Sequence, residues 1–119
     1  MLKFELPWPD PALAPNRKNG RHWSTVHTIK NQALLTGKSA AMMQMIATGY
    51  KPPESTIPVV MTFCAPDKRH RDLDNLLASE KNYLDGVAQA LGVDDKMFEP
   101  ITLKRGDFVR GGCVIVEIG

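Results

Sequence analysis

Two aspartates, Asp72 and Asp74, stand two positions apart directly after a basic run, in the segment DKRHRDLDNL that covers residues 67–76. In an extended segment the side chains alternate, so both carboxylates would lie on the same side. Two ionised carboxylates at close range repel each other unless a proton, basic neighbours or a divalent cation neutralises them. Mg²⁺ takes hard oxygen ligands and keeps several waters, so two or three carboxylates can hold it. A helix-capping aspartate with surface ion pairs explains the same motif without a metal.

A third carboxylate for such a site is expected from the pair Asp94-Asp95, with Asp95 as the preferred ligand and Asp94 as its possible substitute. Both follow a helix expected over residues 75–91, which would span about 25 Å. The segment that carries Asp95 therefore has to fold back toward Asp74, or a second subunit has to supply it. The sequence leaves both arrangements open.

The expected helix 75–91 has an apolar stripe that runs from Leu77 to Leu91, and Lys81 interrupts this stripe. A lysine on a core-facing stripe is costly unless its ammonium group reaches water or an acid. Held near an acid cluster, the ammonium could stabilise negative charge that develops on a phosphate. An ordinary ion pair with Asp85, one helical turn further on, explains the lysine equally well.

The hydrophobic periodicity predicts the order β-α-β-α-β-β for a single domain over residues 1–119. This order predicts an α+β fold in which two helices pack on a mixed or mostly antiparallel sheet. Asp74 is expected to cap the second helix, and the last two strands are expected to form a hairpin at Gly111-Gly112. The expected strands cover residues 2–6, 57–64, 101–110 and 113–119, and the expected helices cover 25–48 and 75–91.

The composition is that of one globular domain: 119 residues, 43% of them hydrophobic and 24% charged, with a net charge of +2. No apolar run approaches the roughly 20 residues of a membrane span, and no secretion signal opens the chain. Cys64 and Cys113 both lie in apolar runs, which favours free thiols in a reducing compartment over a disulfide. We therefore expect a cytoplasmic protein that makes no membrane contact.

Basic residues gather in two places, a proline-bounded loop that ends in His22-Trp23 and the run directly before Asp72. Basic groups beside an aromatic ring suit a DNA strand or an unstacked base, although a solvated loop with a packed tryptophan is the simpler alternative. The candidate DNA-binding residues are Asn16, Arg17, Lys18, Arg21, Lys68, Arg69, His70 and Arg71.

Four segments of the sequence resemble the RusA family of Holliday-junction resolvases, the crossover junction endodeoxyribonucleases of phages and prophages. The segments are LPWP, PNRKNGRHW, APDKRHRDLDNL and ALGVDDKMF, so the resemblance runs nearly end to end. One position departs from the family pattern. The family often has a lysine four residues after the second aspartate of the motif, where this chain has Ala78, and a three-residue insertion would assign that role to Lys81.

The resemblance implies a homodimeric hydrolase that uses Mg²⁺ or Mn²⁺ to cut four-way DNA junctions in recombination and repair. It implies that Asp72, Asp74 and Asp95 are catalytic metal ligands and that Lys81 is the catalytic lysine. Symmetric cutting needs two sites related by a two-fold axis, which a homodimer supplies. Two alternatives stay open: a junction-binding or DNA-binding protein without catalysis, because the lysine is displaced, and a structural dimerisation domain with incidental surface acids.

Overall fold

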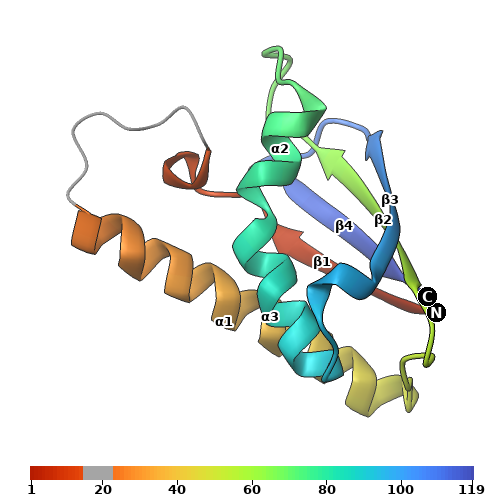
Figure 1. Ribbon diagram of the computed structural model, residues 1–119. Coiled ribbons are helices and arrows are strands. Elements are labelled where there is room, and N and C mark those ends of the chain that lie inside the picture. The colour runs from red at the N-terminus through yellow and green to blue at the C-terminus, as the bar shows by residue number, and fades with distance from the viewer. Residues whose placement is uncertain (15–22) are drawn as a thin grey trace.

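The computed structural model describes residues 1–14 and 23–119 (Figure 1). It confirms the expected fold class, a single α+β domain with a four-stranded mixed sheet. Along the chain the elements are β1 (Leu2–Pro7), the 3₁₀ helix η1 (Pro11–Leu13), α1 (Trp23–Thr48), β2 (Ile57–Cys64), α2 (Leu73–Ser79), α3 (Lys81–Leu91), the 3₁₀ helix η2 (Asp95–Met97), β3 (Phe98–Arg105) and β4 (Cys113–Ile118).

The sheet has the strand order β1-β4-β2-β3. β4 is antiparallel to both β1 and β2, whereas β3 is parallel to β2. The predicted hairpin between the last two strands is therefore wrong, since β2 lies between them. The helical connection between β2 and β3 makes these two strands parallel neighbours, and residues 106–112 then carry the chain across to the centre of the sheet. β3 is left as a largely exposed edge strand.

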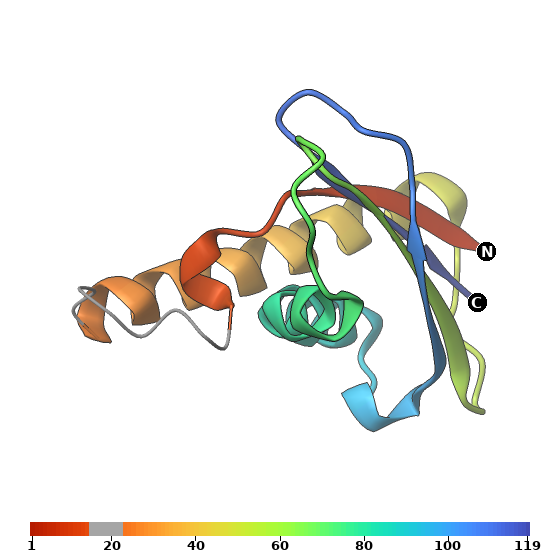
Figure 2. The same cartoon turned by 90° about the horizontal axis from the view of Figure 1, so that it is seen from above.

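The helices cover one face of the sheet (Figure 2). β1 shows why: its alternating sequence turns Leu2, Phe4 and Leu6 inward and leaves the residues between them exposed. The same alternation in the central strands completes an apolar inner face, against which α1 and α3 pack. The fully buried side chains of this core include Ile57, Val59, Met61, Val87, Val114, Val116 and Ile118.

The second expected helix begins two residues earlier than predicted and is divided at Glu80 into α2 and α3. Asp72, and not Asp74, is the N-cap residue, and its side chain makes no capping hydrogen bond. Asp74 lies inside the first turn, so the prediction that it caps the helix is wrong. The extended segment assumed for this motif is also wrong, because helix begins at Leu73.

α1 is a 26-residue helix with one face against the core and large apolar side chains on its opposite face. Its exposed side chains include Leu35, Met43 and Ile46, which are 60%, 69% and 81% accessible. None of the helices in residues 1–14 and 23–119 combines the length and the hydropathy that a bilayer crossing requires.

Two glycines bring the backbones of α1 and α3 into contact. A Cβ atom at Gly37 would overlap the carbonyl group of Tyr83, and one at Gly86 would overlap the carbonyl group of Leu34. Sequence periodicity makes Gly37 look like a weak point of α1, since glycine disfavours helix. The structure shows that the missing side chain is what permits the close crossing of the two helices.

Replacing Gly37 with alanine should lower the free energy of unfolding by about 2–3 kcal/mol, because the backbone of α3 would have to move away. Ser39→Ala, at an exposed position on the same helix, should stay within about 0.5 kcal/mol of the wild type. Urea denaturation followed by circular dichroism measures both values. Equal midpoints for the two variants would contradict the close helix contact.

Candidate nucleic-acid and metal site

The basic run lies in a loop, residues 65–72, that joins β2 to α2, and we call this segment the basic loop. Asp67 organises it. Its carboxylate accepts a hydrogen bond from the Arg69 backbone amide at 2.9 Å and forms an ion pair with Arg71 at 3.1 Å. The hydrogen bond from Arg71 and that from the Arg69 amide hold the pKa of Asp67 below its ordinary value. A short loop rich in cations thus has a defined conformation around one acid.

Arg71 is the least exposed of the four basic residues and supports the loop from inside. Its side chain is only 18% accessible, and its guanidinium group lies 5.3 Å from the ring centre of Trp8, a cation–π distance. It also donates to the carbonyl of Arg69 at 3.0 Å. Trp8 in turn packs edge-on against Phe63 of β2. Arg71 therefore positions the loop, and it is less available to a phosphate than the sequence suggests.

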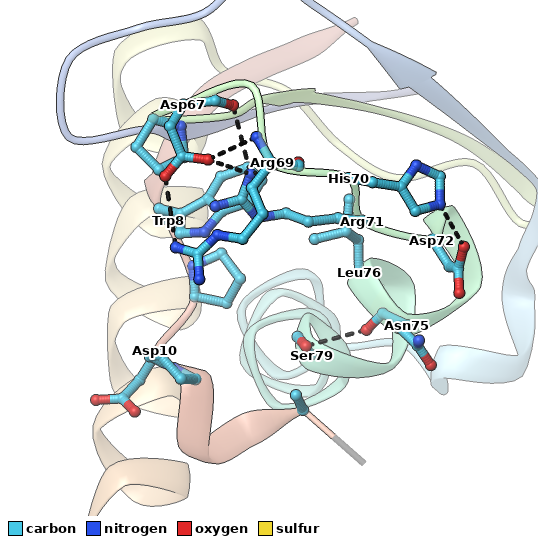
Figure 3. Close-up of a pocket in the computed structure, with 14 residues that line it drawn as sticks. Trp8, Asp10, Asp67, Arg69, His70, Arg71, Asp72, Asn75, Leu76 and Ser79 are labelled. Carbon is cyan, nitrogen blue, oxygen red and sulfur yellow. Dashed lines mark hydrogen bonds and ion pairs between the residues drawn. The ribbon is translucent and has the colours of Figure 1, made fainter. Parts of the chain in front are cut away.

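Lys68, Arg69 and His70 are exposed, and the basic loop separates two open clefts. The first cleft, about 470 Å³, runs from Trp8 past the loop to Asp72 at the start of α2 (Figure 3). The second, about 330 Å³, lies on the other side of the loop. Its cationic lining comprises Lys68, Arg69, Arg71 and Arg105.

Asp72 and Asp74 are both exposed at the N-terminal end of α2. His70 Nε2 lies 3.0 Å from Asp72 Oδ1, and it carries the proton in this hydrogen bond because an ionised carboxylate only accepts. The pair is visible in Figure 3. Acidic side chains are favoured at this end of a helix, where the backbone amides carry partial positive charge. The acid pair is therefore stable where it stands and faces solvent.

The segment after α3 turns back and places Asp95 at the start of α3, beside Lys81. The predicted arrangement within one chain would instead have brought Asp95 to Asp74. Asp95 Oδ2 lies 3.6 Å from Lys81 Nζ, which also lies 3.9 Å from Asp85 Oδ1. Burial, opposed by Lys81 and assisted by Asp95, raises the pKa of Asp85. Asp94 caps η2 by accepting from the Lys96 amide at 3.0 Å, and this hydrogen bond is the main cause that lowers the pKa of Asp94.

Lys81 is 70% exposed and does not lie on the core-facing stripe that the sequence suggested. Together with Asp85 and Asp95 it borders a small cleft of about 210 Å³ between the helices and β3. Lys81 follows Asp74 by seven residues but lies beyond the division at Glu80, as the first residue of α3. The structure thus brings Asp95 to the lysine and not to the acid pair.

The three predicted metal ligands do not form one compact cluster within a single chain. In the part of the chain that the structure describes, no three side chains of His, Cys, Asp or Glu lie close enough together to share one metal ion. The described residues supply two separate acidic groups, Asp72 with Asp74 and Asp85 with Asp95. Four predicted DNA-binding residues lie outside the described ranges: Asn16, Arg17, Lys18 and Arg21.

Glu80 is a residue that the sequence interpretation missed. It is fully buried at the junction of α2 and α3, and neither carboxylate oxygen has a hydrogen-bond partner among the described residues. Loss of hydration raises the pKa of Glu80 to about 8. Burial and the charges of Glu80 and Asp10 raise the pKa of its neighbour Tyr83 to about 12. One signal in the sequence could have revealed that Glu80 is buried. Glu80 shares its helical spacing with the apolar residues Leu76, Tyr83 and Val87.

No protein-family model matches this sequence. Among curated proteins it is 31% identical to an uncharacterized protein of Xylella fastidiosa over 122 residues, a match that covers 99% of this chain and 76% of that relative. Agreement over nearly the whole chain extends beyond the motif around Asp72 to the strands and helices that position it. The chain therefore belongs to the same protein family as this relative from Xylella fastidiosa.

Proposed function

We propose that this protein is a Mg²⁺-dependent endonuclease that resolves four-way DNA junctions. The observation that carries the proposal is the juxtaposition of an exposed cationic loop with the acid pair Asp72 and Asp74 at the start of α2. The RusA-like segments of the sequence, which include this loop and this acid pair, support the same activity. A nuclease needs both features, cations that hold the DNA backbone and carboxylates that hold a divalent ion.

The basic loop suits a phosphate backbone. Lys68, Arg69 and His70 project into solvent between two clefts, whereas Asp67 and Arg71 hold the loop in shape from below. Because the loop is already ordered, less conformational entropy is lost when DNA binds. In this proposal Lys68 and Arg69 contact phosphates on either side of the cut, and Arg71 acts as a positioning residue.

In this proposal Asp72 and Asp74 are the carboxylates that would hold Mg²⁺ or Mn²⁺. Mg²⁺ keeps several waters and is commonly held by one or two carboxylates together with phosphate oxygens of the substrate. When bound, the ion would supply Lewis-acid stabilisation of the phosphate and an activated water. Asp72 and Asp74 hold the ion, and His70 orients the Asp72 carboxylate. In this proposal Asp95 is the third ligand, which it can be only after it leaves Lys81.

In this proposal Lys81, the first residue of α3, serves the reaction as a cation. Its ion pairs with Asp85 and Asp95 hold the ammonium beside the small cleft between the helices and β3, and in this proposal it stabilises charge that builds up on a phosphate of the bound DNA. The Lys81–Asp95 pair is exposed, so it is weak enough to exchange for a phosphate.

A homodimer would supply the two active sites that symmetric cutting requires. The exposed apolar face of α1 supports it. Leu35, Met42 and Ile46 recur at helical spacing on this face, and a contiguous exposed apolar stripe is typical of a contact surface.

The direct test is cleavage of a synthetic four-way junction in Mg²⁺, with a linear duplex of the same sequence as the comparison substrate. We expect paired nicks in the junction, none in the duplex, and no cleavage in EDTA. Absence of nicking in both Mg²⁺ and Mn²⁺ would overturn the proposed activity.

Lys68→Ala should reduce the salt dependence of junction binding. Each phosphate contact contributes about one unit to the slope of log K against log salt concentration, so the slope should fall by about 1. Lys51→Ala removes the same charge from an exposed site in the segment between α1 and β2, distant from the basic loop (Figure 1), and should leave the slope unchanged. Fluorescence anisotropy at several salt concentrations compares the two. Identical slopes would remove the basic loop from the DNA contact surface.

A second candidate function is a junction-binding protein that does not cut. The observation that favours it is the position of Asp95, which lies with Lys81 and not with the acid pair. This alternative predicts tight, salt-dependent junction binding without nicks, even in Mn²⁺.

A further inference from the structure

We propose that Cys64 and Cys113 form a thiol pair that closes reversibly to a disulfide across β2 and β4. Cys64 is the last residue of β2 and Cys113 is the first residue of β4. The register of this antiparallel pair sets the two residues directly opposite each other. This inference concerns the sheet alone and does not rest on the proposed nuclease activity.

The backbone geometry suits the bond. Opposed residues of antiparallel strands have Cα atoms about 4.5–5.5 Å apart, within the range of about 4.4–6.8 Å that a disulfide requires. Both side chains lie on the face of the sheet away from the helices, because their neighbours Phe63 and Val114 are the buried, inward-facing pair. No strand has to shift its register to close the bridge.

The two thiols already interact. Burial is the main cause that raises the pKa of the Cys113 thiol, and the charge and hydrogen bonding of the Cys64 thiol add to it. Both cysteines are free. Cys64 is buried, with its sulfur beside Gly106, where an added Cβ would lie 2.7 Å away. Cys113 is partly exposed, so it is the thiol that a small oxidant meets first.

A small-molecule disulfide such as oxidised glutathione completes the reaction by exchange. The Cys113 thiolate attacks one sulfur of the small disulfide, whose S–S bond breaks and releases one thiolate that takes up a proton. The Cys64 thiolate then attacks the Cys113 sulfur of the mixed disulfide and releases the second small thiol. The protein loses two protons and two electrons, and the small disulfide takes them up and becomes two thiols.

The bond would join two strand residues that each border a loop, and these two loops are neighbours. Cys64 directly precedes the basic loop, and Cys113 directly follows residues 106–112. These loops already touch, since the Val109 amide donates to the Ala65 carbonyl at 3.0 Å. Closing the disulfide restricts the unfolded chain and so should raise the midpoint of thermal unfolding.

The test treats the whole folded chain with oxidised glutathione at pH 8 and follows intact mass and free thiols. We expect the wild type to lose both thiols and about 2 Da, the mass of two hydrogens, and to regain them with dithiothreitol. Cys64→Ser should stop at a glutathione adduct on Cys113, and Cys113→Ser should react slowly at the buried Cys64. The bridge should form at least about tenfold faster in the folded wild type than in urea, because folding holds the thiols together.

Three outcomes would overturn the inference: two thiols that persist in the oxidised wild type, a glutathione adduct as the final product, or a covalent dimer with no internal bridge. Circular dichroism of each serine variant shows whether it is folded, and Cys64→Ala replaces Cys64→Ser if the buried hydroxyl destabilises β2. Mass and thiol titration need no DNA, so a failure of the nuclease proposal leaves this result unaffected.

Discussion

Asp74→Asn should abolish cleavage of a four-way junction in Mg²⁺ while leaving junction binding within a fewfold of the wild type. Loss of a residue that only orients a metal ligand commonly costs 10- to 100-fold in activity, so removing a ligand itself should cost at least about 100-fold. Binding should persist because the phosphate contacts belong to Lys68 and Arg69. Asp74 is exposed and within the first turn of α2, where the loss of one negative charge destabilises a helix by about 1 kcal/mol or less.

The matched control is Glu54→Gln, which also neutralises an exposed carboxylate, in the segment between α1 and β2. It should cut like the wild type. Single-turnover cleavage and anisotropy binding on the same junction separate chemistry from affinity. Equal cleavage rates for Asp74→Asn and the wild type would exclude the acid pair from catalysis. Equal binding without cleavage by either protein would select the second candidate function.

Glu80→Gln should remove most of the pH dependence of stability between pH 4.5 and about 8. In the folded chain the pKa of Glu80 is raised from 4.5 to about 8 because its carboxylate is buried without a partner among the described residues. The folded state therefore holds the proton more tightly than the unfolded state does. Glu80 makes its full contribution to the free energy of unfolding below pH 4.5, and this contribution declines as the pH rises to about 8.

The expected size of the effect is large for one side chain. Within this window each pH unit costs the wild type up to about 1.4 kcal/mol. Glutamine has nearly the shape of a protonated glutamate and does not ionise. The variant should therefore match the wild type near pH 5 and exceed it by several times RT, on the order of 2–4 kcal/mol, at pH 8.

Urea denaturation of both proteins at pH 5, 6, 7 and 8 measures this difference. Subtracting one profile from the other cancels the contribution of the histidines, which are the same in both chains. Parallel profiles would mean that Glu80 has the same pKa in the folded and unfolded states and would contradict its burial.

Much of the fold could be predicted from the sequence because local patterns determine it. The alternation of β1 and the β-branched run of β2 give both strands nearly to the residue. The pairing of β3 could not be predicted in this way, because the strand order depends on where the crossover through α2 and α3 delivers the chain. A turn with Gly111-Gly112 is equally compatible with a hairpin and with the longer passage observed.

The candidate site was predicted less completely, for reasons that lie in three dimensions. The motif correctly indicated exposed basic residues beside Asp72 and Asp74. It could not show that the Arg71 guanidinium group pairs with Asp67 and stacks on Trp8, because Trp8 comes from a distant part of the chain. The position of Asp95 beside Lys81 depends on how the segment after α3 turns back, which spacing alone leaves open.

β3 is an edge strand of the sheet, paired with β2 on one side only, and its composition affects how readily the protein aggregates at high concentration. Free amide and carbonyl groups along such a border invite other chains to add strands, which leads to aggregation. Pro100 removes one of those donors, while Lys104 and Arg105 place like charges at the end of the strand. The exposed β3 edge thus carries residues that oppose the addition of further strands and the growth of fibres.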